Sequence, residues 1–341
     1  MIQINGQKGG GQMLRSALSL SLLTQQPFRM VHIRGQRQSP GLKRQHLACV
    51  RAALQLGGGA ADGAELLSKE LVFHPGSAKA GTYHINIGSA GSTSLVAQTL
   101  IPVLCNLPSP SSLTIEGGTH VPSAPSYDFL QSQYLPALRQ MGQNVSIELV
   151  KAGFFPAGGG CLKIDIKPPS IAQPFTSLPI GQLTGTQAVI SHHKLDKVAH
   201  TLQTLLAQSD ETLQVEIKSY KEAVCPGLTV RLESTHTTTQ NTSYTLTTDA
   251  VALHQLRSQT LVSQLLKKHQ RKLSIQTSID HNLADQLMIY LAQHPNSSLR
   301  TGPLTNHLET NASVIEAFLP GALKLEAKEK GQVLLTSHPT G

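Results

Sequence analysis

An internal repeat constrains what this chain can fold into. Its first copy begins at a glycine triplet, residues 9–11, and continues into a predicted helix over 13–23 whose leucines fall on one face. A predicted strand over 28–33 follows, then a loop and a second helix over 43–56, which the glycines at 57–59 end. Because this order of features recurs further along, we expect α+β units packed around a common axis.

Two further copies are visible. The second predicts elements in the order of the first: a glycine-led helix from residue 88 to 104, a strand over 112–116 and a helix over 127–141. The third, weaker copy predicts a helix over 284–292, a strand near Leu299 and a helix over 312–319. After the second copy, prolines predict a loop over 167–174.

The region between the second and third copies has a different character. It lacks the glycine clusters and predicts strand, helix, strand, strand, strand, helix, with the helices over 194–207 and 250–270. We therefore predict a small inserted α/β domain over 183–276 and a large, discontinuous domain over 1–182 and 277–341.

The charge balance indicates an anionic partner. The formal net charge is +8, and RNA is a better match than lipid because no basic amphipathic helix stands out. Aromatic residues make up 4% of the chain, with no tryptophan, which argues against a base-stacking platform. We therefore expect the phosphates and the end of an RNA to be recognised more than a run of bases.

No sequence feature predicts a membrane segment. The longest apolar stretch, 95–107, is interrupted and too short to cross a bilayer, and the N-terminus has no secretory pattern. The four cysteines are scattered without a CxxC pair, so neither a zinc site nor a disulfide framework is expected. These features predict a cytoplasmic protein without a membrane partner.

Candidate phosphate-binding groups lie in the first repeat. The glycine triplet 9–11 precedes a helix and can aim backbone N–H groups at an anion, although it is neither a Walker loop nor a dinucleotide fingerprint. Basic side chains gather in the same repeat: Arg15, Arg34, Arg37, Lys43 and Arg44. One guanidinium group can donate two parallel hydrogen bonds to two oxygens of a phosphate, so an anion pocket is one interpretation of these side chains. A tight turn and a solvated basic face are the alternatives.

His307 is the candidate nucleophile. It stands directly before a predicted helix whose start is marked by Thr310, Asn311 and Ser313. A neutral imidazole in that place can attack a phosphorus while nearby N–H groups hold the phosphate charge. The alternative is an ordinary histidine, one of 15 in the chain.

Taken together, these segments resemble the RNA 3'-terminal phosphate cyclase family. The matching stretches are GGGQMLRSALSLSLLTQQPF from Gly9, SPGLKRQHLACVRAA from Ser39, GSAGSTSLVAQTLIPVL from Gly88, PSAPSYDFL from Pro122, GFFPAGGG from Gly153, LADQL from Leu283 and NHLETNASVIEAFLP from Asn306. They occur in family order over nearly the whole chain, apart from the insert.

The resemblance implies both a fold and a reaction. The fold is α+β, with a large domain of three βαβαββ-like repeats, related to enolpyruvyl transferases, and a small inserted α/β domain. In the reaction, His307 attacks the α-phosphorus of ATP and carries AMP, with Mg²⁺ or Mn²⁺ present. An RNA 3'-terminal phosphate then accepts the AMP, and the neighbouring 2'-hydroxyl closes a 2',3'-cyclic phosphate. A homodimer is a further possibility.

The resemblance also assigns site residues. It implies that the ATP site is bordered by Gln98, Pro125, Asp128, Asn282, Leu283, Ala284, Asp285 and Gln286. It implies that phosphates of the nucleotide or the RNA end are bound by Gln12, Arg15, Arg34, Arg37 and Gln45.

Three positions depart from the family pattern. Lys8 replaces the glutamate that helps to hold the metal, in a shortened loop, and a cation cannot be a ligand for Mg²⁺. Asn282 replaces a tyrosine and removes an aromatic surface beside the adenine. The segment 120–122, His-Val-Pro, replaces a polar Asp-Asn pair. The metal ligands therefore stay unknown at this stage.

Three other functions compete with the cyclase. A non-catalytic RNA-processing factor on the same fold would lack the nucleophile, so His307 favours the enzyme, whereas Lys8 favours the factor. An enolpyruvyl transferase would use no covalent histidine, and a non-specific RNA binder would need no ordered set of residues.

Overall fold

The computed structural model describes residues 1–169, 174–252 and 256–339. Its first repeat has the order βαβαββ, with elements β1 (Ile2–Asn5), α1 (Gly11–Thr24), β2 (Phe28–Val31), α2 (Arg44–Gly57), β3 (Gly59–Asp62) and β4 (Leu71–Pro75). The strands form one sheet in the order β1-β2-β4-β3. The β1–β2 pair is parallel, because α1 crosses between the two strands.

The second repeat has the same order of strands and helices. Its elements are β5 (Thr82–Asn86), α3 (Thr93–Leu104), β6 (Ser111–Gly117), α4 (Tyr127–Phe129), a π-helical turn (Leu130–Tyr134), α5 (Leu135–Gln140), β7 (Asn144–Lys151) and β8 (Gly160–Lys167). The sheet order β5-β6-β8-β7 matches that of the first repeat strand for strand. The internal repeat predicted from the glycine clusters is therefore confirmed.

The third repeat is interrupted. Its elements are α8 (His281–Gln293), β13 (Ser298–Thr301), α9 (Asn306–Phe318), β14 (Leu323–Ala327) and β15 (Val333–Ser337), with the sheet order β13-β15-β14. The place of its first strand is taken by Thr176, which pairs in parallel with Ser298. Thr176 precedes the insert in sequence, so the insert separates this strand position from the first helix of the repeat.

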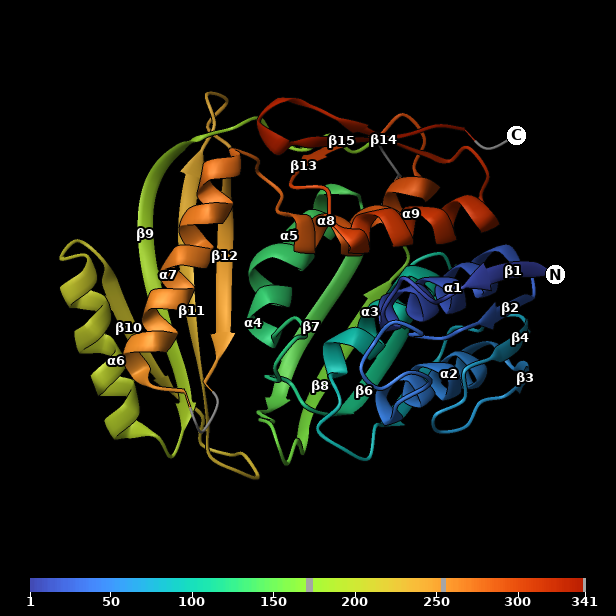
Figure 1. The fold of residues 1–341 in the computed structure, drawn as a ribbon, viewed down its shortest axis with the longest axis horizontal. Helices are drawn as coiled ribbons and strands as arrows, with labels where there is room; N and C mark the ends of the chain where they lie inside the picture. The colour runs from blue at the N-terminus through green and yellow to red at the C-terminus, as the bar shows by residue number, and fades with distance from the viewer. Residues whose placement is uncertain (170–173, 253–255, 340–341) are drawn as a thin grey trace.

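The insert forms its own sheet and core. Its elements are β9 (Gln182–His193), α6 (Asp196–Ser209), β10 (Gln214–Ser219), β11 (Gly227–Thr237), β12 (Ser243–Val251) and α7 (Ser258–Ile275), with the sheet order β10-β9-β11-β12. Leu202, Val230 and Leu265 belong to a hydrophobic cluster separate from the main core. Figure 1 shows this sheet with α6 and α7 on one side of the molecule. The division at residues 183 and 276 stays a prediction that this second core supports.

One predicted helix in the insert began too early. The sequence predicted a helix from Ala250, but Ala250 lies in β12, opposite Val230 of β11, and α7 begins at Ser258. The threonine-rich segment before Ala250 favours a strand, since β-branched residues pack well on a pleated surface. Residues 253–255 of that prediction, and 170–173 of the predicted proline-rich loop, lie outside the described residues.

The predicted position of His307 directly before a helix is also wrong. Helix α9 begins at Asn306, with Thr305 as its N-cap, and the Thr305 side chain accepts a hydrogen bond from the backbone N–H of Leu308. Thr310, which was predicted to mark the helix start, instead donates its hydroxyl to the carbonyl of Asn306 at 2.6 Å. His307 therefore stands in the first turn of a longer helix.

Helix α1 connects the core to the candidate site. It packs against α2, α3 and α9, and its leucines Leu14 and Leu18 are fully buried. Burial of each such side chain contributes about 2 kcal/mol to the free energy of folding. Among the described residues, no helix is long and apolar enough to cross a membrane.

Candidate active site

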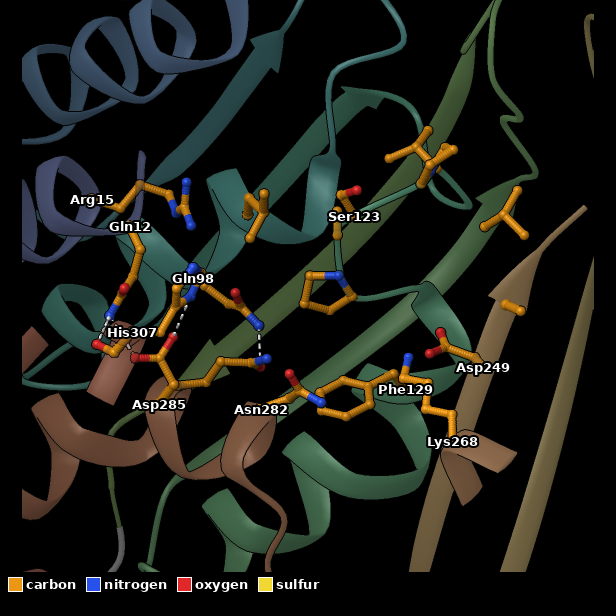
Figure 2. Close-up of a pocket in the computed structure, with 18 of the residues that line it drawn as sticks. Gln12, Arg15, Gln98, Ser123, Phe129, Asp249, Lys268, Asn282, Asp285 and His307 are labelled. Atoms are coloured by element: carbon orange, nitrogen blue, oxygen red, sulfur yellow. Dashed lines mark hydrogen bonds and ion pairs between the residues drawn. The ribbon is translucent and has the colours of Figure 1, made fainter. Parts of the chain in front are cut away.

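A cavity of about 500 Å³ lies where the repeats meet the insert (Figure 2). Three helices line it with residues spaced by three and four positions, which places each set on one helix face. These sets are Gln12, Arg15, Ser16 and Ser19 of α1; Asn282, Asp285, Gln286 and Ile289 of α8; and Leu261, Gln264, Leu265, Lys268 and Lys272 of α7. The volume is in the range of small-molecule sites.

His307 and Asp285 form the reactive end of the cavity. Two amides fix the Asp285 carboxylate: Gln12 donates to Oδ1, and Asn311 donates to the same oxygen at 3.2 Å. The other oxygen, Oδ2, lies 3.7 Å from Nδ1 of His307. The His307 side chain is 52% exposed, so its ring is accessible from the cavity it lines. A carboxylate on the Nδ1 side favours the tautomer whose Nε2 is free to act as a nucleophile.

The start of α1 forms a positively charged end of the site. Gly10 is the N-cap of this helix, and Nη2 of Arg37 lies 3.2 Å from where a Cβ on Gly10 would stand. A Cβ on Gly11 would be 3.1 Å from Nη1 of Arg15 and would collide with Nε2 of His46. The two glycines therefore let basic side chains approach a helix N-terminus, which is a favourable place for phosphate.

The environment at this end of the site determines which of its basic side chains carry a charge. Burial, together with the charges of Arg15 and Arg34, lowers the pKa of His46 to about 3. His46 is thus neutral, and since its Nδ1 accepts a hydrogen bond from the Lys43 backbone at 3.0 Å, its proton is on Nε2, beside Gly11. Burial also lowers the pKa of Arg15, but a guanidinium remains charged at neutral pH. His46 is therefore a neutral donor, and the arginines supply the positive charge.

Between the arginine end and the insert, α3, α8 and the loop before α4 contribute uncharged polar groups to the cavity wall. Gln98 of α3 donates to the side-chain carbonyl of Gln286, and Asn282, one turn earlier on α8, lines the same cavity. The loop carrying Pro125 is fixed because Ser94 donates its hydroxyl to the Pro125 carbonyl at 2.6 Å. These groups can hold a base and a sugar between them.

The structure places three of the predicted ATP-site residues elsewhere. Leu283 and Ala284 are buried in the main core, because on α8 they point away from the stripe that faces the cavity. Asp128 is directed towards the insert, where Nη1 of Arg231 lies 2.6 Å from its Oδ1. The remaining five, which line the cavity, are Gln98, Pro125, Asn282, Asp285 and Gln286.

Of the predicted phosphate-binding residues, some lie at the site and others support the surrounding backbone. Gln12 and Arg15 line the cavity, and Arg37 reaches the start of α1 from outside it. Arg34 donates to the carbonyls of Ser39 and Gly41 at 2.7 and 3.1 Å, and so supports that loop. The Gln45 side chain accepts from the backbone N–H of Ser92 at 3.2 Å and anchors the start of α3.

Sequence reasoning missed the contribution of the insert. From the insert, Asp249 of β12 and Lys268 and Lys272 of α7 line the cavity. Phe129 of α4, in the second repeat, also lines it and was also missed. The sequence predicted a helix in this region, but periodicity does not reveal which surface a helix faces. The assignment therefore required the tertiary structure.

The site does not offer a set of ligands for a resident metal ion. No group of three or more His, Cys, Asp and Glu side chains that could hold a metal occurs within the described ranges. The Asp285 carboxylate is already held by Gln12 and Asn311, and Lys8, where the resemblance implies a metal-binding glutamate, carries a cation that cannot be a metal ligand. A role for Mg²⁺ or Mn²⁺ thus stays a prediction without support from these residues.

These features define a site for a nucleoside phosphate, with an exposed histidine at one helix N-terminus and arginines at another. The family model described as RNA 3'-terminal phosphate cyclase matches residues 6–325. The chain belongs to the RNA 3'-terminal phosphate cyclase family.

Curated relatives with that name match almost end to end. The RNA 3'-terminal phosphate cyclase of Pseudomonas fluorescens is 38% identical over 98% of this chain and 96% of the relative. That of Ectopseudomonas mendocina is 37% identical over 93% and 92%, and that of Salmonella typhimurium is 35% identical over 97% and 96%. Among solved structures, the enolpyruvyl transferase NikO from Streptomyces tendae aligns with 51% of this chain and 33% of its own chain at 16% identity, with a TM-score of 0.29.

Proposed function

We propose that this chain is an ATP-dependent RNA 3'-terminal phosphate cyclase that works through a covalent His307–AMP intermediate. The observation that carries the proposal is the placement of His307, which opens into the cavity from the first turn of α9 with the Asp285 carboxylate behind its Nδ1. The substrate would be an RNA with a 3'-terminal phosphate, and the product a 2',3'-cyclic phosphodiester.

The first step is nucleotidyl transfer to the histidine. Nε2 of His307 attacks the α-phosphorus of ATP, an N–P bond forms, and the P–O bond to the β-phosphate breaks. The leaving pyrophosphate is directed towards Arg15 and the start of α1, where positive charge and N–H groups stabilise it. The imidazole ring becomes positively charged in the adduct, and the neighbouring Asp285 carboxylate stabilises that charge.

The later steps use the activated adduct. An oxygen of the RNA 3'-phosphate attacks the same phosphorus, the N–P bond breaks, and an RNA-adenylate anhydride forms. The 2'-hydroxyl then attacks the RNA phosphorus, AMP leaves, and the hydroxyl proton passes to solvent. Because the 2'-hydroxyl is already held beside its target, ring closure needs positioning more than chemical assistance. Cytoplasmic location and a homodimer remain predictions.

A pair of oligonucleotides tests this sequence of steps. With ATP, an RNA carrying a 3'-phosphate is expected to gain a phosphatase-resistant 2',3'-cyclic end. The same RNA with a terminal 2'-deoxyribose is expected to accumulate the adenylate, because it has no hydroxyl to close the ring. A denaturing gel and mass spectrometry distinguish the cyclic phosphate from the adenylate. Unchanged 3'-phosphate on both RNAs would contradict the proposal.

Lys8 gives a prediction about metal use. Its side chain is exposed, and its carbonyl accepts a hydrogen bond from Asn306, the neighbour of His307, at 3.0 Å. In Lys8→Glu, a carboxylate replaces an ammonium group close to the phosphates, so metal should become more important. We expect the ratio of His307 labelling rates with Mn²⁺ and with EDTA to rise about tenfold.

The control for this prediction is Lys197→Glu, which makes the same charge change on the exposed face of α6. An unchanged ratio in Lys8→Glu, with the control also unchanged, would mean that Lys8 takes no part in neutralising phosphate charge.

A further inference from the structure

The insert supplies the wall of the cavity that lies opposite the reactive histidine. Asp249 comes from β12 and Lys268 from α7, and both line the cavity. Figure 2 shows these two side chains on one side of the pocket and His307 with Asp285 on the other. The insert therefore takes part in the site.

Asp249 and Lys268 are available to a ligand. Within residues 1–169, 174–252 and 256–339, neither side chain forms a hydrogen bond or an ion pair with another residue. The next lysine on the same face is committed to the fold: Lys272 donates to the Thr247 carbonyl and to Asp280, both at 2.6 Å. Lys272 thus holds the wall in place, and the other two charged side chains line the cavity.

The charge distribution fixes which end of a nucleotide meets this wall. The arginine end carries excess positive charge from Arg15 and Arg37, so the phosphates are drawn there. At the insert wall, the charge of Lys268 is offset by that of Asp249, and Lys272 is neutralised by Asp280. A neutral wall with one donor and one acceptor suits the edge of a base better than a phosphate.

We propose that Asp249 and Lys268 are specificity-determining residues that recognise the base of the nucleoside triphosphate. The Asp249 carboxylate accepts a hydrogen bond from the 6-amino group of adenine, and the Lys268 ammonium donates to the adjacent ring nitrogen, N7. A 6-oxo base places an acceptor against the carboxylate and is rejected, because two acceptors cannot share a proton. This inference rests on the proposed function, since it takes ATP to be the ligand of the cavity.

The wall is rigid enough for such discrimination. Besides the Lys272–Asp280 pair, Ser132 and Gln133 of the π-helical turn bond to Thr247 and Thr245 of β12, at 3.1 and 2.9 Å. These contacts fix the strand that carries Asp249 against the repeats. Groups held in position beforehand discriminate between ligands more strongly than mobile ones.

The test compares ATP with inosine triphosphate (ITP), which has a 6-oxo group and the same N7. For the wild type we expect His307 labelling from ATP to exceed that from ITP. In Asp249→Asn the amide can donate to the 6-oxo group, so the ATP/ITP ratio of initial rates should fall at least tenfold. In Lys268→Ala both rates should fall about tenfold with the ratio unchanged, because both bases present N7.

The matched control is Lys267→Ala, which removes the neighbouring exposed lysine of α7 that does not line the cavity. It should leave both rates unaltered. An ATP/ITP ratio in Asp249→Asn equal to that of the wild type would overturn the inference.

A separate measurement distinguishes this inference from the proposed function. Calorimetric binding of ATP and ITP to wild type and Asp249→Asn reports the base preference without any chemistry. If the wild type binds ATP over ITP and the variant does not, the inference stands even when no AMP is transferred. If neither protein distinguishes the two nucleotides in binding, the inference fails even when AMP transfer is observed.

Discussion

His307→Ala is expected to abolish transfer of AMP to the protein. When wild type is incubated with α-³²P-ATP and Mg²⁺ or Mn²⁺, a denaturing gel should show one labelled band that is lost in acid, as expected of a P–N bond. In the variant no nitrogen replaces Nε2, so the label should fall below detection, at least a thousandfold, and cyclisation should fall with it. The His307 side chain is half exposed, so the variant should fold normally.

His200→Ala is the matched control for this experiment. His200 lies exposed on α6 in the insert, so its removal should leave the label intact. Label retained by His307→Ala would place the covalent bond elsewhere and overturn the proposed mechanism. Absence of label from a folded wild type with either metal would favour a non-catalytic RNA-processing factor, and Lys8 would then record the loss of activity.

The sequence predicted the repeat well because local signals agreed with the tertiary arrangement. Glycine triplets, apolar periodicity and strand-like segments marked α1, β2 and α2 within two residues of their observed ends, whereas α3 begins at Thr93, five residues after the glycine at which its prediction began. Each of these elements buries an apolar stripe, and that stripe is visible in the sequence. At the start of α9 two threonines could cap the helix, and Thr305 is the N-cap because its side chain accepts the hydrogen bond from the Leu308 N–H.

The candidate site was only partly predictable. His307, Gln12 and Asp285 were identified through family motifs, and the structure brings them together. Asp249 and Lys268 lie in the insert, where the sequence offered no motif and the cavity arises only when α7 packs towards α8. Leu283 was wrongly assigned to the ATP site, because a contiguous motif on a helix presents only about half of its positions to any one surface.

Asp128 and Arg231 join the insert to the repeats through a buried ion pair. Nη1 of Arg231 lies 2.6 Å from Asp128, and its Nε lies 2.8 Å from Glu233. On the other side, the fully buried His120 donates from Nε2 to Asp128 at 3.2 Å and stacks on Phe154 with ring centroids 5.2 Å apart. Burial acts to raise the pKa of Asp128, but the hydrogen bond from His120 and the charge of Arg231 outweigh it and lower that pKa to about 2.

Arg231→Met is expected to destabilise the protein by about 3–5 kcal/mol, because it leaves the Asp128 carboxylate buried without its cationic partner. Thermal and urea unfolding measure the loss. Since the pKa of Asp128 is lowered on folding, its stabilisation is present above about pH 4 and lost as the pH falls towards 2. The destabilisation caused by Arg231→Met should therefore shrink as the pH falls through this range.

Two comparisons show whether the ion pair, and not the lost volume, causes this effect. Asp128→Asn should partly rescue Arg231→Met, so that the double variant is more stable than the sum of the single changes predicts. Arg29→Met breaks an exposed pair with Glu70 and should cost no more than about 1 kcal/mol. Additive effects of Arg231→Met and Asp128→Asn would mean that the Asp128–Arg231 charge pair contributes nothing to the stability of the fold.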